Sequence, residues 1–127
     1  MNGGSSKPWP TELRLHKDRK TLTVVFDNAE AFDLTAEYLR VSSPSAEVQG
    51  HSPNERKTVG GKSQVAILEV NPVGNYAVRL VFDDGHNTGL YTWSYLATLG
   101  AEKDQRWADY LAELQAKGLS RERPGQK

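Results

Sequence analysis

The chain contains no cysteine among its 127 residues. This absence excludes disulfide bonds, thiolate nucleophiles, iron–sulfur ligation by the chain itself and every cysteine-based zinc site. Secreted domains of this size often carry disulfides, so the absence also favours a cytoplasmic location. Residues 1–10 lack the apolar core of a signal peptide, and no apolar run approaches the length needed to cross a membrane.

An excess of either charge is also missing, since 16 basic residues face 16 acidic ones. Without a basic excess, the chain has no long-range field that would attract nucleic acid or an anionic membrane. We therefore expect neither nucleic acid nor a membrane as a partner. The length, with 37% hydrophobic and 25% charged residues, is typical of one globular domain.

Alternating apolar and polar residues predict an antiparallel sheet built from two hairpins. The first hairpin pairs residues 12–16 with residues 21–26, and residues 32–34 are a possible third strand. The second hairpin pairs residues 65–70 with residues 76–82 around a turn that contains proline and glycine.

Helix signals follow each hairpin. Helices are predicted at residues 36–40, 93–99 and 102–117. Thr35 and Thr92 precede the first two as N-caps, and Gly118 follows the third as a terminator. The core-facing stripe of the third helix consists of Trp107, Tyr110, Leu111 and Leu114. The fold class is therefore α+β, a small antiparallel sheet of two hairpins with a C-terminal pair of helices, and not a βαβ repeat.

Composition also divides the chain into a domain and two tails. Residues 1–10 and 119–127 are predicted to be disordered tails around one domain at residues 11–118. Within the domain, residues 42–64 are rich in Ser, Pro, Gly, Glu and Lys. A connection of this length is usually mobile or functional, so we expect it, a sheet edge or an aromatic helix surface to contact a partner.

One predicted turn concentrates the polar chemistry of the chain. Asp83, Asp84 and His86 lie within it, and His51 lies in the long loop, so the four are candidate ligands for a metal ion or a small molecule. A metal site needs three or four converging ligands and one turn supplies two at most, which favours a turn whose carboxylates hold backbone amides. No Ser-His-Asp arrangement is indicated, and no catalytic residue is predicted.

Aromatic residues concentrate in the C-terminal third of the chain. They are Tyr91, Trp93, Tyr95, Trp107 and Tyr110. The favoured interpretation is helices packed on a sheet. The alternative is that Tyr91 and Trp93 belong to an exposed partner surface, since Tyr and Trp are favoured at interfaces.

The segment from Asn71 to Leu96 resembles the gamma-butyrobetaine hydroxylase-like N-terminal domain, a domain of unknown function. Three motifs carry the resemblance: the strand that begins Asn75-Tyr76, the Asp84-Gly85-His86 turn and the run Tyr91-Thr92-Trp93-Ser94-Tyr95-Leu96. Leu39-Arg40 followed by a Ser/Pro loop also matches. The resemblance covers about residues 10–115 and implies a small antiparallel sheet with flanking helices.

The resemblance also implies that a metal site of the family is lost in this chain. In the hydroxylases of this family, three cysteines after the Leu-Arg pair and the histidine of the turn bind a structural zinc. The matching positions here are Ser43, Ser45, Val48 and His86. Because serine and valine do not replace thiolates as zinc ligands, the resemblance implies a degenerate site and no bound metal or cofactor.

In the family, the domain precedes an oxygenase domain, occurs as a small stand-alone bacterial protein, or is attached to P-loop iron–sulfur carrier proteins. The catalytic iron triad and the 2-oxoglutarate site belong to the oxygenase domain, which these 127 residues do not contain. We therefore expect a non-enzymatic stand-alone accessory module with a protein partner. The alternative is a residual metal- or small-ligand-binding protein linked to iron–sulfur or oxygenase pathways.

Overall fold

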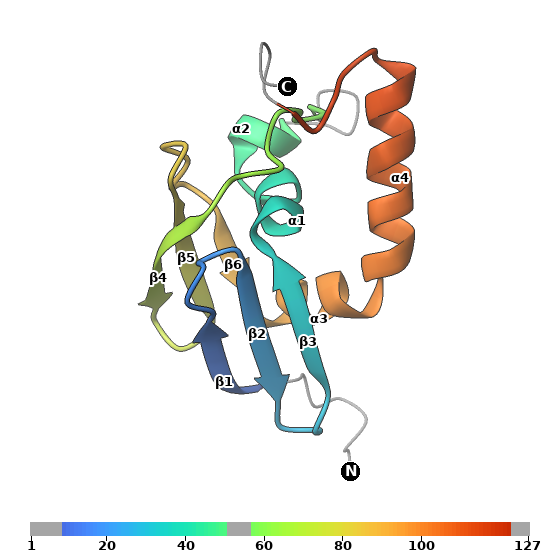
Figure 1. Ribbon diagram of the computed structural model, residues 1–127. Helices are drawn as coiled ribbons and strands as arrows, with labels where there is room; N and C mark the ends of the chain where they lie inside the picture. The colour runs from blue at the N-terminus through green and yellow to red at the C-terminus, as the bar shows by residue number, and fades with distance from the viewer. Residues whose placement is uncertain (1–8, 51–56, 123–127) are drawn as a thin grey trace.

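The computed structural model describes residues 9–50 and 57–122 (Figure 1). Its strands are β1 (Pro10–Leu15), β2 (Thr21–Phe26), β3 (Ala31–Thr35), β4 (Ile67–Val73), β5 (Ala77–Phe82) and β6 (Leu90–Thr92). Its helices are α1 (Ala36–Val41), α2 (Ala46–Gln49), α3 (Trp93–Ala101) and α4 (Lys103–Ala116). The strands form two three-stranded antiparallel sheets, ordered β1-β2-β3 and β4-β5-β6. The predicted α+β class, with antiparallel hairpins and a C-terminal pair of helices, is confirmed.

Both predicted hairpins form, β3 is the third strand proposed for the first, and β6 adds a third strand to the second. The predicted turn of the second hairpin is too long, because β4 continues to Val73 and its Pro72 pairs with Val78. In the first sheet, Leu22 of β2 lies opposite Leu34 of β3. In the second, Val78 of β5 lies opposite Tyr91 of β6. β6 is not among the predicted strands, because it has only three residues and shows no alternation of its own.

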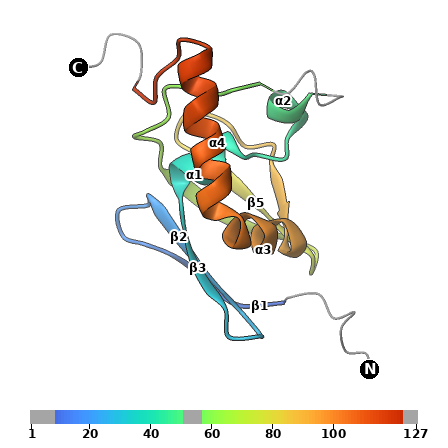
Figure 2. The same ribbon diagram turned by 90° about the vertical axis from the view of Figure 1, so that its right-hand side faces the viewer.

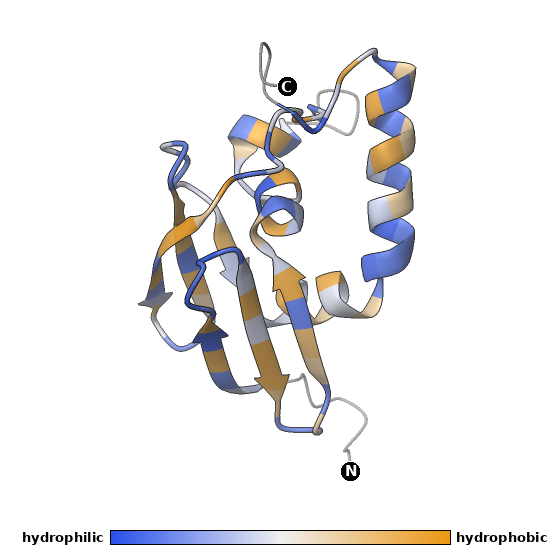
Figure 3. Ribbon diagram, in the orientation of Figure 1, coloured by the Kyte–Doolittle hydropathy of each residue, from blue (hydrophilic) through white to orange (hydrophobic). Residues whose placement is uncertain are grey.

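The two sheets meet along the turn between β1 and β2. The backbone N–H of Ile67 donates to the carbonyl of Arg19, and the Arg19 guanidinium donates to the carbonyl of Leu68, each at 2.8 Å. Hydrophobic residues alternate with polar ones along the strands (orange in Figure 3), and buried apolar side chains from both sheets form one core. Leu22, Val24, Leu80 and Leu96 have no exposed surface in this core.

The helices close one side of the sheets. Figure 2 shows α4 in front of α1, and the edge-to-face pair of Tyr38 and Trp107, with ring centroids 6.3 Å apart, confirms that these helices touch. The predicted caps are also confirmed: the hydroxyls of Thr35 and Thr92 accept the N–H of Tyr38 and of Tyr95, both at 3.1 Å. In the parts of the chain described, no helix is both long and apolar enough to span a membrane.

Two predicted helix details differ from the structure. The second predicted helix ends at Leu99, whereas α3 continues through Gly100, where the absence of a Cβ makes room for the ring of Phe32. In α4, Tyr110 is buried as predicted, but Leu111 is 40% exposed. The apolar stripe predicted for α4 is therefore too wide, because the buried face of this helix includes Tyr110 and Leu114 but not Leu111.

Parts of the predicted long loop and of the predicted C-terminal tail have defined structure, which their composition does not indicate. Residues 46–49 of the predicted long loop form α2, capped by the Ser45 hydroxyl on the N–H of Glu47. Residues 119–122, assigned to a tail, hydrogen bond to residues 60–63. We call residues 119–122 the C-terminal strap. Tertiary contacts outweigh composition in both segments.

Candidate functional site

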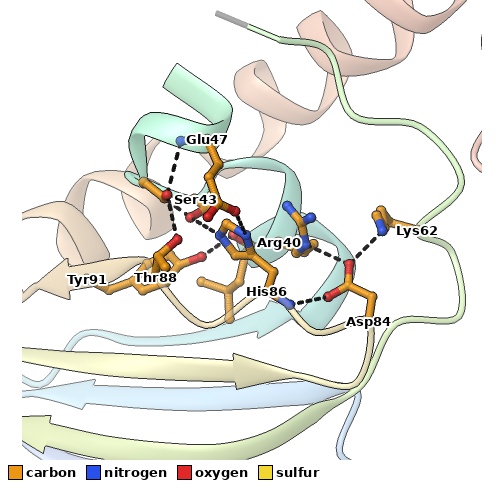
Figure 4. A network of polar contacts seen from close by, with 10 residues as sticks. Arg40, Ser43, Glu47, Lys62, Asp84, His86, Thr88 and Tyr91 are labelled. Carbon is orange, nitrogen blue, oxygen red and sulfur yellow. Dashed lines mark hydrogen bonds and ion pairs between the residues drawn. The ribbon is translucent and has the colours of Figure 1, made fainter. Parts of the chain in front are cut away.

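The turn that follows β5 carries a buried histidine to the end of α1 and to α2 (Figure 4). Gly85 adopts a φ of +93°, and its N–H donates to the carbonyl of Phe82 at 3.1 Å. The Asp84 carboxylate accepts the backbone N–H of His86 at 3.0 Å. This local geometry turns the His86 side chain inward, where it is 2% exposed.

Both ring nitrogens of His86 have partners. Nε2 lies 2.8 Å from the hydroxyl of Ser43, and Nδ1 lies 3.0 Å from a carboxylate oxygen of Glu47. Burial, together with the charge of Arg40, lowers the pKa of His86, and the nearby Glu47 and Asp84 carboxylates only partly oppose this. The neutral imidazole is therefore the favoured form inside the protein.

Ser43 is sealed in the centre of this network. It has no exposed surface, and its hydroxyl also accepts the backbone N–H of Ser45 at 3.2 Å. Gly89 packs against it so closely that an added Cβ would stand 2.5 Å from the Ser43 oxygen. The Ser45 hydroxyl in turn pairs with that of Thr88 at 2.7 Å.

Ser43, His86 and Glu47 have the hydrogen-bond connectivity of a Ser-His-acid triad. Catalysis by such a triad requires a substrate carbonyl to come within about 3–3.5 Å of the serine oxygen. In the described structure the Ser43 oxygen is enclosed by Pro44, Gly89 and its hydrogen-bond partners, and no substrate could approach it.

A second polar cluster lies beside the histidine and holds Asp84. Its carboxylate accepts Arg40 Nε at 2.8 Å and pairs with Lys62 Nζ at 2.6 Å. Burial alone would raise the pKa of Asp84, but hydrogen bonds from Lys62, from the His86 N–H and from Arg40 outweigh it and lower the pKa to about 2. This carboxylate is thus an anchor between two cations.

The predicted ligand residues do not converge. Asp83 is exposed and accepts the N–H of Ala66 at 3.1 Å, whereas Asp84 is held by its cations. His51 lies outside the described residues. In the described ranges, no group of three His, Cys, Asp or Glu residues is arranged to hold a metal ion.

The positions named by the family resemblance do come together. Ser43 contacts His86 directly, Ser45 is hydrogen bonded to Ser43, and Val48 is buried nearby on α2. Residue spacing alone missed this cluster, since 43 residues separate Ser43 from His86. It also missed Glu47, a residue of a low-complexity segment that gives no signal of a histidine partner.

The aromatic candidates belong mainly to the interior. Tyr91 has no exposed surface, and its hydroxyl donates to the carbonyl of Leu39 at 2.6 Å. Trp93 is half-buried, donates to the carbonyl of Asn75 at 2.8 Å and meets Trp9 edge to face. Tyr91 therefore cannot form part of a surface for a partner.

Acidification is expected to weaken the fold through His86. Because the pKa of His86 is lowered from 6.5 in the folded protein, the unfolded chain takes up this proton first as the pH falls. The contribution of neutral His86 to the free energy of unfolding is complete above pH 6.5. It is lost as the pH falls from that value to the lowered pKa, with a slope of at most about 1.4 kcal/mol per pH unit. Urea unfolding across this range should show the loss in the wild-type chain.

A non-titrating variant provides the control for this pH dependence. His86→Gln keeps a polar side chain but cannot bind a proton in this range, so its free energy of unfolding should have a smaller pH slope. Asp84 titrates elsewhere, since its pKa of about 2 lies below its ordinary 3.8 and its contribution is lost only in that acidic range. Equal slopes for both proteins below pH 6.5 would contradict the prediction.

Comparison with known proteins places this geometry in a family. The family model described as "Gamma-butyrobetaine hydroxylase-like, N-terminal" matches residues 13–97. An NMR solution structure is 50% identical, with a TM-score of 0.81 over 96% of this chain and 95% of its own; a second is 47% identical, with a TM-score of 0.79 over 95% and 90%. A crystal structure from Acidithiobacillus ferrooxidans, of a protein with unknown function in the DUF971 family, is 42% identical, with a TM-score of 0.61 over 73% and 93%. Among curated proteins there is no match.

Proposed function

This chain belongs to the gamma-butyrobetaine hydroxylase-like, N-terminal family, a family with members of unknown function, and we propose that it is a non-enzymatic accessory module that binds a protein partner. In this proposal, the His86 network takes the structural place of the zinc site found in the family's hydroxylases. The observation that carries the proposal is the closed hydrogen bonding of Ser43, which leaves neither a free nucleophile nor a free ligand.

The chemistry of the site supports a structural role. A zinc ion would hold α1, α2 and the turn after β5 through four ligands. Here the His86 bonds to Ser43 and Glu47 and the ion pair of Asp84 with Arg40 join the same three segments. Nη1 of Arg40 is buried without a hydrogen-bond partner, but both ring nitrogens of His86 have one. The hydrogen bonds of His86 therefore support an ordered turn without a metal.

The surface proposed for the partner lies on the other side of α1. A groove between β3, the start of α1 and α4 is lined by Tyr38, Trp107 and Asp104, among others. Tyr38 is buried and forms only the floor of this groove, whereas Trp107 is half-buried and accessible. An accessible aromatic residue with polar neighbours is typical of the centre of an interface. Arg121 of the C-terminal strap already lies in this groove, which supports its use for a side chain of a protein ligand.

Purification from the native source tests both halves of the proposal. We expect a tagged wild-type chain to carry substoichiometric zinc and to retain a partner at a constant ratio. The charge reversal Asp104→Lys should release the partner, because Asp104 is exposed and lines the groove. The measurements are metal analysis and quantitative mass spectrometry of the eluates.

A matched variant on the same helix separates the groove from general charge effects. Asp109→Lys makes the same change at an exposed position five residues further along α4, about 140° around the helix axis. It should retain the partner. Stoichiometric zinc that disappears in His86→Ala would contradict the metal-free interpretation. Equal partner recovery by both charge variants would show that the groove is not the partner site.

A further inference from the structure

The chain turns back after α4 and attaches to the loop that precedes β4. Gly118, with a φ of +67°, ends the helix and reverses the chain. The backbone N–H of Gly61 donates to the carbonyl of Ser120 at 2.8 Å, and that of Ser63 donates to the carbonyl of Arg121 at 3.0 Å. The C-terminal strap is therefore held in part through its backbone, as a peptide ligand would be.

The side chain of Arg121 enters a charged and aromatic pocket. Its Nε and Nη2 donate to the two carboxylate oxygens of Glu37 at 2.8 and 2.7 Å, a bidentate pair. The guanidinium also lies over the ring of Trp107, 5.5 Å from its centroid. The Glu37 side chain is only 7% exposed, whereas that of Arg121 is 46% exposed.

The pocket around Arg121 has acidic residues in its lining. A cavity of about 370 Å³ adjoins the ion pair, and Glu37 and Asp104 are among the residues that line it. The cations in the same walls are Lys103 and Arg121. If Arg121 withdraws, the buried Glu37 loses its bidentate partner, and Lys103 is the one cation that remains among the described lining residues. A buried carboxylate is costly without a cation, so the emptied pocket favours a second guanidinium.

We propose that the pocket formed by Glu37 and Trp107 binds an arginine from an extended segment of a partner protein, and that the C-terminal strap occupies it as an internal competitor. This inference rests on the proposed function, which it deepens by naming the chemistry of the partner. The strap supplies the pattern that a partner must copy: one arginine with peptide carbonyls on either side that accept from Gly61 and Ser63.

The geometry selects a peptide over a small cation. A metal ion or free amine would use the carboxylates but leave the N–H groups of Gly61 and Ser63 without acceptors. Gly60 adds a steric requirement, since an added Cβ would stand 2.8 Å from the Ser120 carbonyl, so the ligand backbone must pass close to it. The fork of a guanidinium also matches a carboxylate better than an ammonium does.

Peptide binding to the full chain tests the proposal. The probe is a fluorescent peptide with the sequence of residues 118–122, Gly-Leu-Ser-Arg-Glu, with blocked ends. The wild-type chain should bind it weakly, because a tethered competitor acts at an effective concentration of roughly millimolar. Arg121→Ala removes the competing guanidinium and leaves the strap only its weaker contacts, among them the backbone bonds to Gly61 and Ser63, so this variant should bind the peptide about tenfold more tightly or better. A peptide with alanine in place of arginine should bind to neither protein.

Two further variants identify the pocket as the binding site. In the Arg121→Ala background, Glu37→Gln removes the charge with little change in shape and should abolish the gain. If that protein does not fold by circular dichroism, Asp104→Lys on the exposed rim replaces it, with Asp109→Lys as the control that binds normally. Equal affinity of the wild-type and Arg121→Ala chains for the arginine peptide would overturn the proposal. An affinity that is unchanged by Glu37→Gln and by Asp104→Lys would overturn it as well.

The outcomes separate this inference from the proposed function. A peptide that fails to bind Arg121→Ala, while the native partner is still released by Asp104→Lys, rejects the arginine pocket and leaves the interaction module standing. A peptide that binds as expected, while no native partner is retained, supports the pocket and rejects the accessory role.

Discussion

The triple variant Ser43→Cys/Ser45→Cys/Val48→Cys is expected to bind one zinc ion and to be strongly stabilised by it. Three thiolates and the imidazole of His86 would then form the Cys₃His set of a structural zinc site. In the wild-type chain, the Ser43 oxygen already lies 2.8 Å from Nε2 of His86. Ser45 and Val48 are three residues apart, so their side chains share one face of the α2 turn.

The expected stabilisation is larger than that of any single contact in the network. Zinc bound at about a thousand times its dissociation constant raises the free energy of unfolding by about 4 kcal/mol, less any binding to the unfolded chain. Without metal, the variant should be less stable than the wild type, because it loses the bonds that Ser43 and Ser45 make to His86 and Thr88. Chemical unfolding with and without zinc measures both effects, and cobalt substitution reports tetrahedral thiolate ligation.

The control is the same triple variant with His86→Ala, which retains the thiols and loses the fourth ligand. It should bind zinc more weakly and gain less stability. If the triple variant shows no stabilisation by zinc, positions 43, 45, 48 and 86 do not form the family's site. The interpretation that the hydrogen bonds of His86 take the structural place of the family's zinc site would then be wrong.

The sequence predicts those parts of the fold whose signals are local. The N-caps Thr35 and Thr92 and both hairpins were found because a cap needs one hydroxyl and a strand needs alternation over several residues. Residues 46–49 and 90–92 escaped because elements of four and three residues are too short for a period to show. Their structure is fixed by tertiary contacts, such as the pairing of Val78 with Tyr91.

The candidate site needs information that neither period nor spacing carries. Its central contact joins residues 43 positions apart, and the Glu37–Arg121 pair joins residues 84 positions apart. Only the family resemblance indicated the first pair, through the matching of Ser43 and His86 to zinc ligands. Nothing in the sequence indicated the second pair, since an arginine in a charged C-terminal segment is indistinguishable from a solvated one. Charge composition describes a tail and does not identify its partner.

Gly89→Ala is the single substitution expected to damage the site most directly. Gly89 does not adopt a left-handed backbone, so alanine introduces no conformational strain there. Its Cβ would stand 2.5 Å from the Ser43 oxygen and 3.2 Å from the Tyr91 ring. Relief of this overlap displaces Ser43 from His86, and we expect a loss of about 2–4 kcal/mol from overpacking and broken buried hydrogen bonds. Urea unfolding measures it.

A double-mutant cycle with Ser43→Ala isolates the collision from other effects of the methyl group. Ser43→Ala alone removes the oxygen that contacts His86 and Ser45, and should cost about 1–3 kcal/mol. Because the double variant has no oxygen for the new Cβ to strike, it should be more stable than the sum of the two single losses predicts. Gly85→Ala serves as a contrast, since its φ of +93° strains alanine but no atom lies within 4 Å. If the losses in the free energy of unfolding at positions 89 and 43 are strictly additive, the Ser43 oxygen can move away from the new Cβ. That result would contradict the conclusion that Ser43 is held tightly in the network.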